Sequence, residues 1–277
     1  MMRYLAIMAT AVLLQVTPAA VRAQSQEELD TLFAALGLPE MIEIMREEGL
    51  AYGDDLAAEM LPGGPSPDWG MAVSVIYDAQ MMYEEVRGAF DEALAGEDVA
   101  AMTDFFTSDL GRQIVELEVS ARRALLDDAV EEAAYEHAAL SAADETPRYL
   151  LVEEFIGTNG LIDSNVEGAL NASYAFYMGL IDGGAMPIGV TAETALQDVW
   201  ARESEIRMNT AEWAYAFLLM AYAPLSEEDL RAYIAFSATE AGEALNDALF
   251  LAFNGTFDDI SRALGLASAR FMQSQEL

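Results

Sequence analysis

The chain has 277 residues, with 13 Arg, no Lys, 48 acidic residues, one His and no Cys, so its formal net charge is −35 at pH 7. This charge argues against strong nucleic-acid binding, because phosphate contacts need clustered basic side chains. The chain is also 53% hydrophobic and 9% aromatic, which is too apolar for a disordered acidic segment. We therefore expect a folded protein with a solvated acidic surface.

Residues 1–23 have the pattern of a secretory signal peptide. Arg3 precedes an apolar run from Leu5 to Val16, and small residues lead to Val21-Arg22-Ala23, after which cleavage is expected. The run is shorter than the roughly 20 residues that span a bilayer, so no transmembrane segment is expected in the mature chain. These features predict a periplasmic protein that folds without disulfides.

Helix start and stop signals follow one another through the first half, residues 24–146. Ser25 and Glu28 have the spacing of a capping box, and Pro62 to Pro67 form a clear break. Ser141 to Pro147 mark a seam between the halves. The expected helices cover residues 25–36, 39–61, 67–94, 98–106 and 108–140.

Helical spacing continues through the second half, residues 147–277, and no strand pattern is found. The expected helices there cover residues 147–157, 165–181, 191–207, 210–221, 226–236, 239–253 and 257–272. The predicted fold class is all-α, with two tandem helical repeats, 24–146 and 147–277, packed as a helical bundle.

An internal offset of 131 residues supports this repeat. It aligns Phe105 with Phe236 and Gly111 with Gly242, in a unit of helix, short break and helix. Each Phe is predicted to be buried near the end of a helix, and each Gly to let the next helix approach closely. Chance similarity of two acidic, Ala-rich helices is the alternative. Further matches at this offset include Leu94 with Leu225, Glu97 with Glu228, Asp98 with Asp229, Ala101 with Ala232 and Trp69 with Trp200.

The segments Phe106 to Gly111 and Tyr233 to Gly242 resemble the Phe/Tyr, Ser/Thr, Gly signature of a bacterial exported family, the domain of unknown function (DUF) number twenty fifty-nine. The second half, from about Phe155, is similar to the alphaproteobacterial version, and the first half resembles it more loosely. The resemblance implies an exported helical protein. It carries over no reaction and no catalytic residue.

Missing residue types exclude several chemistries. Without Cys there is no thiolate nucleophile or Cys-ligated metal, and without Lys there is no Schiff base or phosphate-loop lysine. His137 is the only imidazole, and we interpret it as structural. The abundant carboxylates leave acid/base catalysis open in principle, but they point to no catalytic, cofactor-binding or metal-ligating residue. Asp127, Asp128, Glu131 and Glu132 lie at helical spacing and are interpreted as a solvated face. The pairs Glu118 with Arg122 and Arg123 with Asp127 have i,i+4 spacing and are expected to relieve part of the charge repulsion.

Aromatic residues in the second half give the best remaining indication of a site. Tyr174 and Tyr177 lie on one predicted helix, and Trp213 and Tyr215 on another. Such residues suit a ligand pocket, although they also serve in helical cores. The leading hypothesis is a non-enzymatic periplasmic binding or interaction module, without cofactor, whose partner is an envelope protein or a small apolar ligand. A carboxylate-dependent periplasmic hydrolase and a purely structural envelope protein are the alternatives.

Overall fold

A computed structural model describes residues 26–187 and 189–274. The predicted signal peptide, residues 1–23, lies outside the described residues. Within them the secondary structure is helical throughout, without strands, which confirms the all-α bundle. The helices are α1 (Gln26–Ala35), α2 (Leu38–Met60), α3 (Pro67–Ile76), α4 (Ala79–Ala93), α5 (Val99–Phe106), α6 (Asp109–Ala124), α7 (Asp128–Ala143), α8 (Pro147–Thr158), α9 (Leu161–Asp182), α10 (Ala192–Ala201), α11 (Glu203–Ala221), α12 (Glu227–Ser237) and α13 (Glu240–Ser274).

Two helices that the sequence predicts as continuous are divided by aspartate caps. Asp78 Oδ1 accepts a hydrogen bond from the amide of Met81 at 2.9 Å, which separates α3 from α4. Asp127 Oδ1 accepts one from the amide of Ala129 at 2.9 Å, which separates α6 from α7. The expected single helices 67–94 and 108–140 are therefore wrong, because an aspartate that satisfies free amides starts a new helix.

Near the C-terminus, two helices that the sequence predicts as separate form one. Helix α13 continues through the break expected between residues 253 and 257. Gly255 lies on the exposed face of α13, where a helical glycine costs only about 1 kcal/mol. The hydroxyl of Thr256 is buried and donates to the carbonyl of Ala252 at 3.2 Å, within the helix. The boundary between α10 and α11 also differs from the prediction and falls at Arg202.

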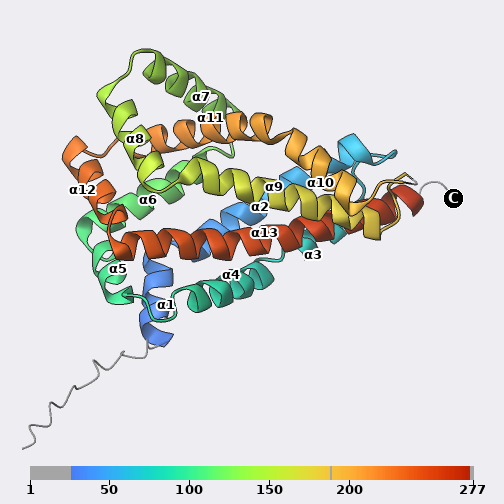
Figure 1. Ribbon diagram of the computed structural model, residues 1–277, viewed down its shortest axis with the longest axis horizontal. Helices are drawn as coiled ribbons and strands as arrows, with labels where there is room; N and C mark the ends of the chain where they lie inside the picture. The colour runs from blue at the N-terminus through green and yellow to red at the C-terminus, as the bar shows by residue number, and fades with distance from the viewer. Residues whose placement is uncertain (1–25, 188, 275–277) are drawn as a thin grey trace, which may run out of the picture.

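Helix α13 runs the length of the molecule, with α9 beside it and parallel to it (Figure 1). Glycines allow the two backbones to approach closely. A methyl side chain at Gly179 would collide with the carbonyl oxygen of Arg262, and one at Gly265 with that of Phe176. At one end of α13 lie α5 and α12, and at the other end lies α10 (Figure 1). The packed pair of α9 and α13 forms the long axis of the fold.

Both halves of the chain contribute to the same hydrophobic core. Trp69 and Phe90 from the first half are fully buried in it, together with Tyr222 from the second. The ring of Trp69 packs edge-on against Phe271 of α13, with a centroid separation of 5.4 Å. Trp200, which the 131-residue offset aligns with Trp69, is 59% exposed. The offset therefore does not predict the environment of every aligned residue.

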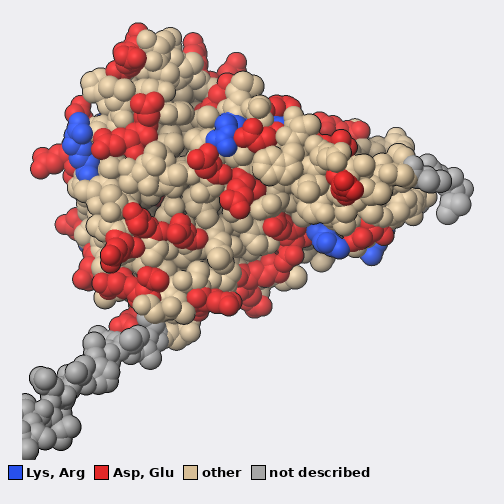
Figure 2. All heavy atoms as spheres, in the orientation of Figure 1, with Lys and Arg blue, Asp and Glu red and all other residues tan. Residues whose placement is uncertain are grey.

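The surface is strongly acidic. Carboxylate side chains are spread over the visible face, and Arg side chains are few and scattered (Figure 2). Several Arg residues of the molecule are paired with acids, as in Arg87 with Asp91 at 2.7 Å and Arg262 with Asp182 at 2.5 Å. No helix in the described part of the chain is long and apolar enough to cross a membrane.

Candidate functional site

Two helix junctions in the molecule share the same local geometry. Before α6, the Ser108 hydroxyl accepts a hydrogen bond from the amide of Gly111 at 3.0 Å. Before α13, the Thr239 hydroxyl accepts one from the amide of Gly242 at 3.1 Å. These are ordinary N-terminal caps, in which a side-chain oxygen satisfies a free amide. Their identical spacing agrees with the offset of 131 residues.

Each capping hydroxyl also donates a hydrogen bond back to the preceding helix. The acceptors are the carbonyls of Phe105, at 2.6 Å, and Phe236, at 2.7 Å. A methyl side chain at Gly111 would collide with the Phe105 carbonyl oxygen, and one at Gly242 with that of Phe236. Both turns are therefore closed so tightly that only glycine fits.

The Phe side chains at these junctions contact each other. The rings of Phe105 and Phe236 are stacked, with centroids 4.0 Å apart and an angle of 10° between the planes. Both are partly buried, less than the sequence predicts, because they pack at the contact between α5 and α12 rather than in the interior. The two junctions thus meet directly in space.

A cavity of about 520 Å³ opens next to this contact. Its volume is in the range of small-molecule sites. The walls come from α2, α6, α9 and α13, with further residues from the α8 and α11 regions and from α12. Apolar side chains dominate the lining, including Leu36, Leu38, Met41, Met45, Phe106, Val115, Phe155, Phe217, Leu245, Leu249, Phe250, Phe253 and Phe257.

Helix α13 forms the longest wall. Its lining residues recur along one face from Gly242 to Phe257, which are fifteen residues apart and therefore separated by about 22 Å along the helix axis. Leu249 and Phe253 lie on this face and are only partly buried, because part of each side chain borders the cavity. The wall is long and mainly aromatic and apolar, with Asn246 and Asn254 as its polar side chains.

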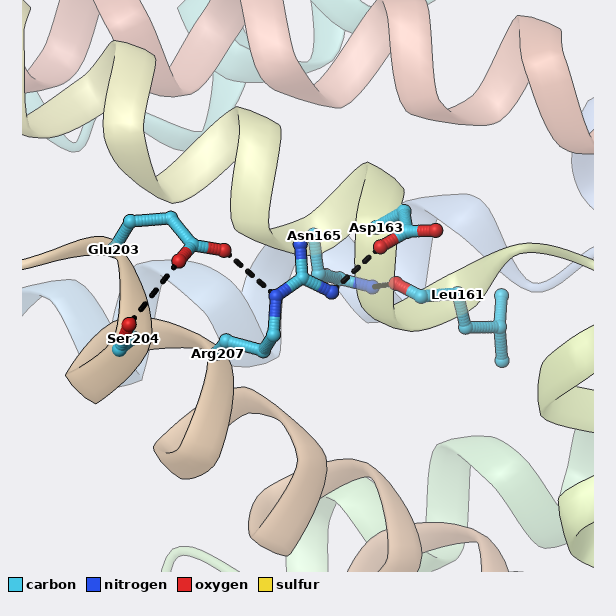
Figure 3. A network of polar contacts seen from close by, with 6 residues as sticks. All are labelled: Leu161, Asp163, Asn165, Glu203, Ser204 and Arg207. Atoms are coloured by element: carbon cyan, nitrogen blue, oxygen red, sulfur yellow. Dashed lines mark hydrogen bonds and ion pairs between the residues drawn. The ribbon is translucent and has the colours of Figure 1, made fainter. Parts of the chain in front are cut away.

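Helix α9 makes room for the cavity by presenting small side chains. Ala169 and Ala172 line the cavity on one face of this helix, and Gly168 beside them is in close contact with the Asn254 side chain of α13. The start of α9 is held to α11 by Arg207, which contacts Asp163 at 2.6 Å and Glu203 at 2.7 Å (Figure 3). Of the residues drawn in Figure 3, Leu161 and Asn165 also line the cavity, so this network borders its wall.

Helix α6 contributes a carboxyl group to the cavity. Glu118 Oε1 accepts hydrogen bonds from the hydroxyls of Tyr222, at 2.5 Å, and Tyr233, at 3.4 Å. Protein surrounds the group, and its accessible part borders the cavity. Burial raises the pKa of Glu118 to about 7, although the two tyrosine hydrogen bonds act to lower it. Glu118 therefore titrates near neutral pH.

The two tyrosines act as donors to this carboxyl group. Burial, followed by the nearby Glu118 charge, raises the pKa of Tyr222 and of Tyr233 well above the ordinary value of tyrosine. Both hydroxyls therefore keep their protons. The second oxygen of Glu118, Oε2, has no hydrogen-bond partner in the described part of the chain.

Arg122, one turn after Glu118, also lines the cavity. The sequence predicts a surface pair between these two residues, but Arg122 instead binds both carboxylate oxygens of Glu48 on α2, each at 2.6 Å. Its guanidinium also lies over the Trp213 ring, 4.7 Å from the centroid. The pair expectation is wrong because α2 places a better-oriented carboxylate beside Arg122, which leaves Glu118 to the tyrosines.

The walls formed by α6 and α13 correspond position by position. Glu118 and Arg122 of α6 differ by 131 from Leu249 and Phe253 of α13, and all four line the cavity. The same offset relates two further lining pairs, Phe106 with Ser237 and Val115 with Asn246. Equivalent faces of the two helices therefore enclose one cavity, with both charged groups on the α6 side and mainly apolar groups, beside Asn246 and Asn254, on the α13 side.

The four aromatic residues predicted as a pocket are not brought together. Tyr174 and Tyr177 both pack against a small core outside the main one, and Tyr174 also lines a smaller cavity of about 310 Å³ on the opposite face of α9. Trp213 stacks on Phe217 at 5.2 Å, and Tyr215 stacks on Tyr149 at 5.0 Å. None of the four lines the cavity of about 520 Å³.

The predicted structural histidine, His137, is exposed on α7. Among the described residues, no group of three or more His, Cys, Asp or Glu side chains has an arrangement that could hold a metal ion.

Sequence reasoning misses Glu118 as a site residue, although the sequence carries a signal for it. Gly111, Ile114 and Ala121 form the buried stripe of α6. Glu118 falls at the helical spacing of this stripe, four residues after Ile114. A carboxylate on an apolar stripe indicates a buried polar contact, and its partners Tyr222 and Tyr233 are more than 100 residues away.

Comparison with known proteins gives one family match. The model of a family described as "Uncharacterized protein conserved in bacteria (DUF2059)" matches residues 80–139. This match spans α4 to α6 and most of α7, and so contains the first junction and Glu118. The match therefore lies in the first half, whereas the sequence resemblance to this family is stronger in the second half. No curated protein and no solved structure matches the chain.

Proposed function

We propose that this protein is a non-enzymatic binding protein that holds a small apolar or amphiphilic molecule in the cavity between α6 and α13. The observation that carries the proposal is the 520 Å³ cavity itself, lined by leucine, methionine and phenylalanine side chains. Apolar surface bordering such a space favours an apolar occupant by about 25 cal/mol per Å² removed from water. On the α9 side, Ala169 and Ala172 contribute only small side chains to the lining.

A carboxylate-dependent hydrolase is the alternative from a different class. Such an enzyme needs two facing carboxyl groups with separate roles. Among the described residues that line the cavity, Glu118 is the only carboxylate, and both of its recorded partners are tyrosine hydroxyls. A binding function therefore explains the apolar lining and the single carboxylate of the cavity better than a hydrolase function does.

The proposal is tested with a variant that places a large side chain in the cavity from α9. The neutral fluorescent probe N-phenyl-1-naphthylamine is titrated into the protein and into the Ala172→Phe variant. We expect saturable binding to the unmodified protein, weakened about tenfold or more in the variant because the new ring takes the space of the ligand. The control is Ala133→Phe, the same substitution on an exposed face of α7, which should leave binding unchanged.

Circular dichroism melting of each variant establishes that it is folded. Absence of saturable probe binding to the unmodified protein would reject the proposal. Equal binding by the Ala172→Phe and Ala133→Phe proteins would place the probe elsewhere and also contradict it.

The proposal includes a periplasmic location and an origin of the two halves by duplication. The N-terminal pattern ending at Ala23 supports export, and the two matching junctions support duplication. Intact-mass measurement of the periplasmic fraction should find a chain that begins at Gln24. A chain that retains Met1 would contradict the export proposal.

A further inference from the structure

The cavity has a polar end where its two charged residues lie, and its neutral polar lining residues are Asn159, Asn165, Tyr222, Tyr233, Ser237, Asn246 and Asn254. Glu118 presents its free Oε2 atom there, and Tyr222 and Tyr233 occupy its Oε1 atom. The other charged group that lines the cavity is Arg122. From this end the wall of α13, which is apolar except for Asn246 and Asn254, extends as far as Phe257. An occupant with one polar end and one extended apolar body matches this arrangement.

The charges at the polar end disfavour an anionic head group. Arg122 is neutralised by the two-point contact with Glu48, so an ionised Glu118 leaves this end with one net negative charge. The formal charge of the whole chain, −35, has the same sign. A carboxylate or phosphate head group would therefore meet repulsion both on approach and at the site.

Hydrogen bonding at the same end selects for a donor. The hydroxyls of Tyr222 and Tyr233 already donate to Glu118 Oε1. The free oxygen, Oε2, accepts a hydrogen bond when Glu118 is ionised. An amine head group supplies both a donor and a compensating positive charge, and such charge-assisted hydrogen bonds are the stronger kind. An alcohol supplies the donor alone.

We infer that the cavity takes a single-chain amphiphile whose head group donates a hydrogen bond to Glu118 and carries no negative charge, with an amine preferred over an alcohol. This inference rests on the proposed binding function and adds the chemical class of the ligand and its orientation. The head group lies against α6, and the alkyl chain lies along α13.

The experiment compares three head groups on one chain length. Decylamine, decanol and decanoate each displace N-phenyl-1-naphthylamine from the protein at pH 8.5. We expect decylamine to bind at least about tenfold more tightly than decanoate, with decanol between them, since one favourable charge contact is worth about this factor. The Glu118→Gln variant, which keeps the shape but loses the charge, should abolish the preference for amine over carboxylate.

The matched control is Glu116→Gln, which removes one carboxylate from the exposed face of the same helix and should preserve the ranking. A second measurement uses the unmodified protein alone. Lowering the pH to 5.5 protonates Glu118 and should weaken decylamine binding and strengthen decanoate binding. The groups that face Glu118 are Arg122, Tyr222 and Tyr233, with Glu48 behind Arg122, and the tyrosines stay protonated over this range.

The outcomes separate the two proposals. If neither N-phenyl-1-naphthylamine nor any decyl compound binds, the proposed binding function fails. If the probe binds but decanoate binds best, or all three decyl compounds bind equally, the head-group inference is overturned and the binding function stands. An unchanged ranking in Glu118→Gln also overturns the inference. Should that variant not fold, the pH comparison on the unmodified protein decides the question.

Discussion

Helices α6 and α13 begin in the same way and then serve different purposes. Each follows a capping hydroxyl, Ser108 or Thr239, and each has a glycine in its first turn that touches the preceding helix. Helix α6 then presents Glu118 and Arg122 to the cavity, whereas α13 presents Leu249 at the position equivalent to Glu118. The junction sets the direction of a helix, and the residues two turns later set the chemistry of its wall.

Substitutions of the two junction glycines should change the stability of the protein more than any other substitution considered for this pair of helices. Gly111→Ala and Gly242→Ala should each lower the free energy of unfolding by about 3 kcal/mol, because the added methyl group meets a backbone carbonyl that cannot move aside. Urea unfolding measures the loss. The two values should agree closely if the two junctions are physically equivalent.

Gly88→Ala is the control for this pair. Gly88 is an exposed glycine in the interior of α4 with open space around it, so alanine should stabilise the protein by about 0.5 to 1 kcal/mol through helix propensity. Stabilisation by alanine at either junction would show that the close contact is absent.

The stacked phenylalanines should give the next largest effect. Phe105→Ala and Phe236→Ala should each cost about 2 kcal/mol, below the range for a fully buried Phe because both rings are partly buried. The double variant should cost about 1 kcal/mol less than the two losses added, since the rings contact each other. Additive losses in urea unfolding would contradict the contact.

The two phenylalanines should differ in their effect on ligand binding. Phe236 lines the cavity and Phe105 does not. Phe236→Ala should therefore change the affinity for N-phenyl-1-naphthylamine, and Phe105→Ala should leave it unchanged. Equal changes in probe affinity in the two variants would contradict the assignment of Phe236, and not Phe105, to the cavity lining.

The smallest effect concerns Glu118 and the pH dependence of stability. The folded-state pKa of Glu118, about 7, is higher than its ordinary value of 4.5, so the folded state binds more protons between these two values. The stability contributed by this group is present at low pH and is lost as the pH rises from 4.5 through 7. Relative to Glu118→Gln, the unmodified protein should lose about 1 to 2 kcal/mol over this window.

Urea unfolding at pH 5 and pH 8 measures this difference, and Glu116→Gln serves as the control on the exposed face of α6. The comparison with a single variant cancels the contribution of the other carboxylates. A difference that grows in the opposite direction with pH would mean that Glu118 is ionised more readily in the folded protein than in the unfolded chain.

The sequence predicts the class of fold and most of the helices correctly, because caps and breakers act locally. Ser66 and Pro67 start α3 as expected, and the Ser108 cap is found where the repeat places it. The errors occur where a local signal has two meanings. Asp78 is compatible with the interior of a helix in the sequence, but in the structure it caps a new helix. The expected break around Gly255 is absent, because this glycine lies on an exposed face of α13.

The candidate site is much less accessible to sequence reasoning, because a cavity depends on contacts between distant segments. The aromatic clusters at Tyr174 and Trp213 are dense in sequence, yet they pack in separate places. The cavity instead forms where α9 has small side chains and where two helices 131 residues apart face each other. Local composition gives no information on either condition, although the repeat indicates which helices to compare.

The uninterrupted length of α13 has a consequence for the order in which the protein can be assembled. This helix comes last among the described elements, yet it packs against α3, α4 and α5 as well as α9. Because the chain is synthesised from the N-terminus, the earlier helices lack their contacts with α13 until synthesis is nearly complete. A chain that stops before Glu240 lacks the helix around which the others pack, and it should remain a target for proteases rather than fold as a smaller domain.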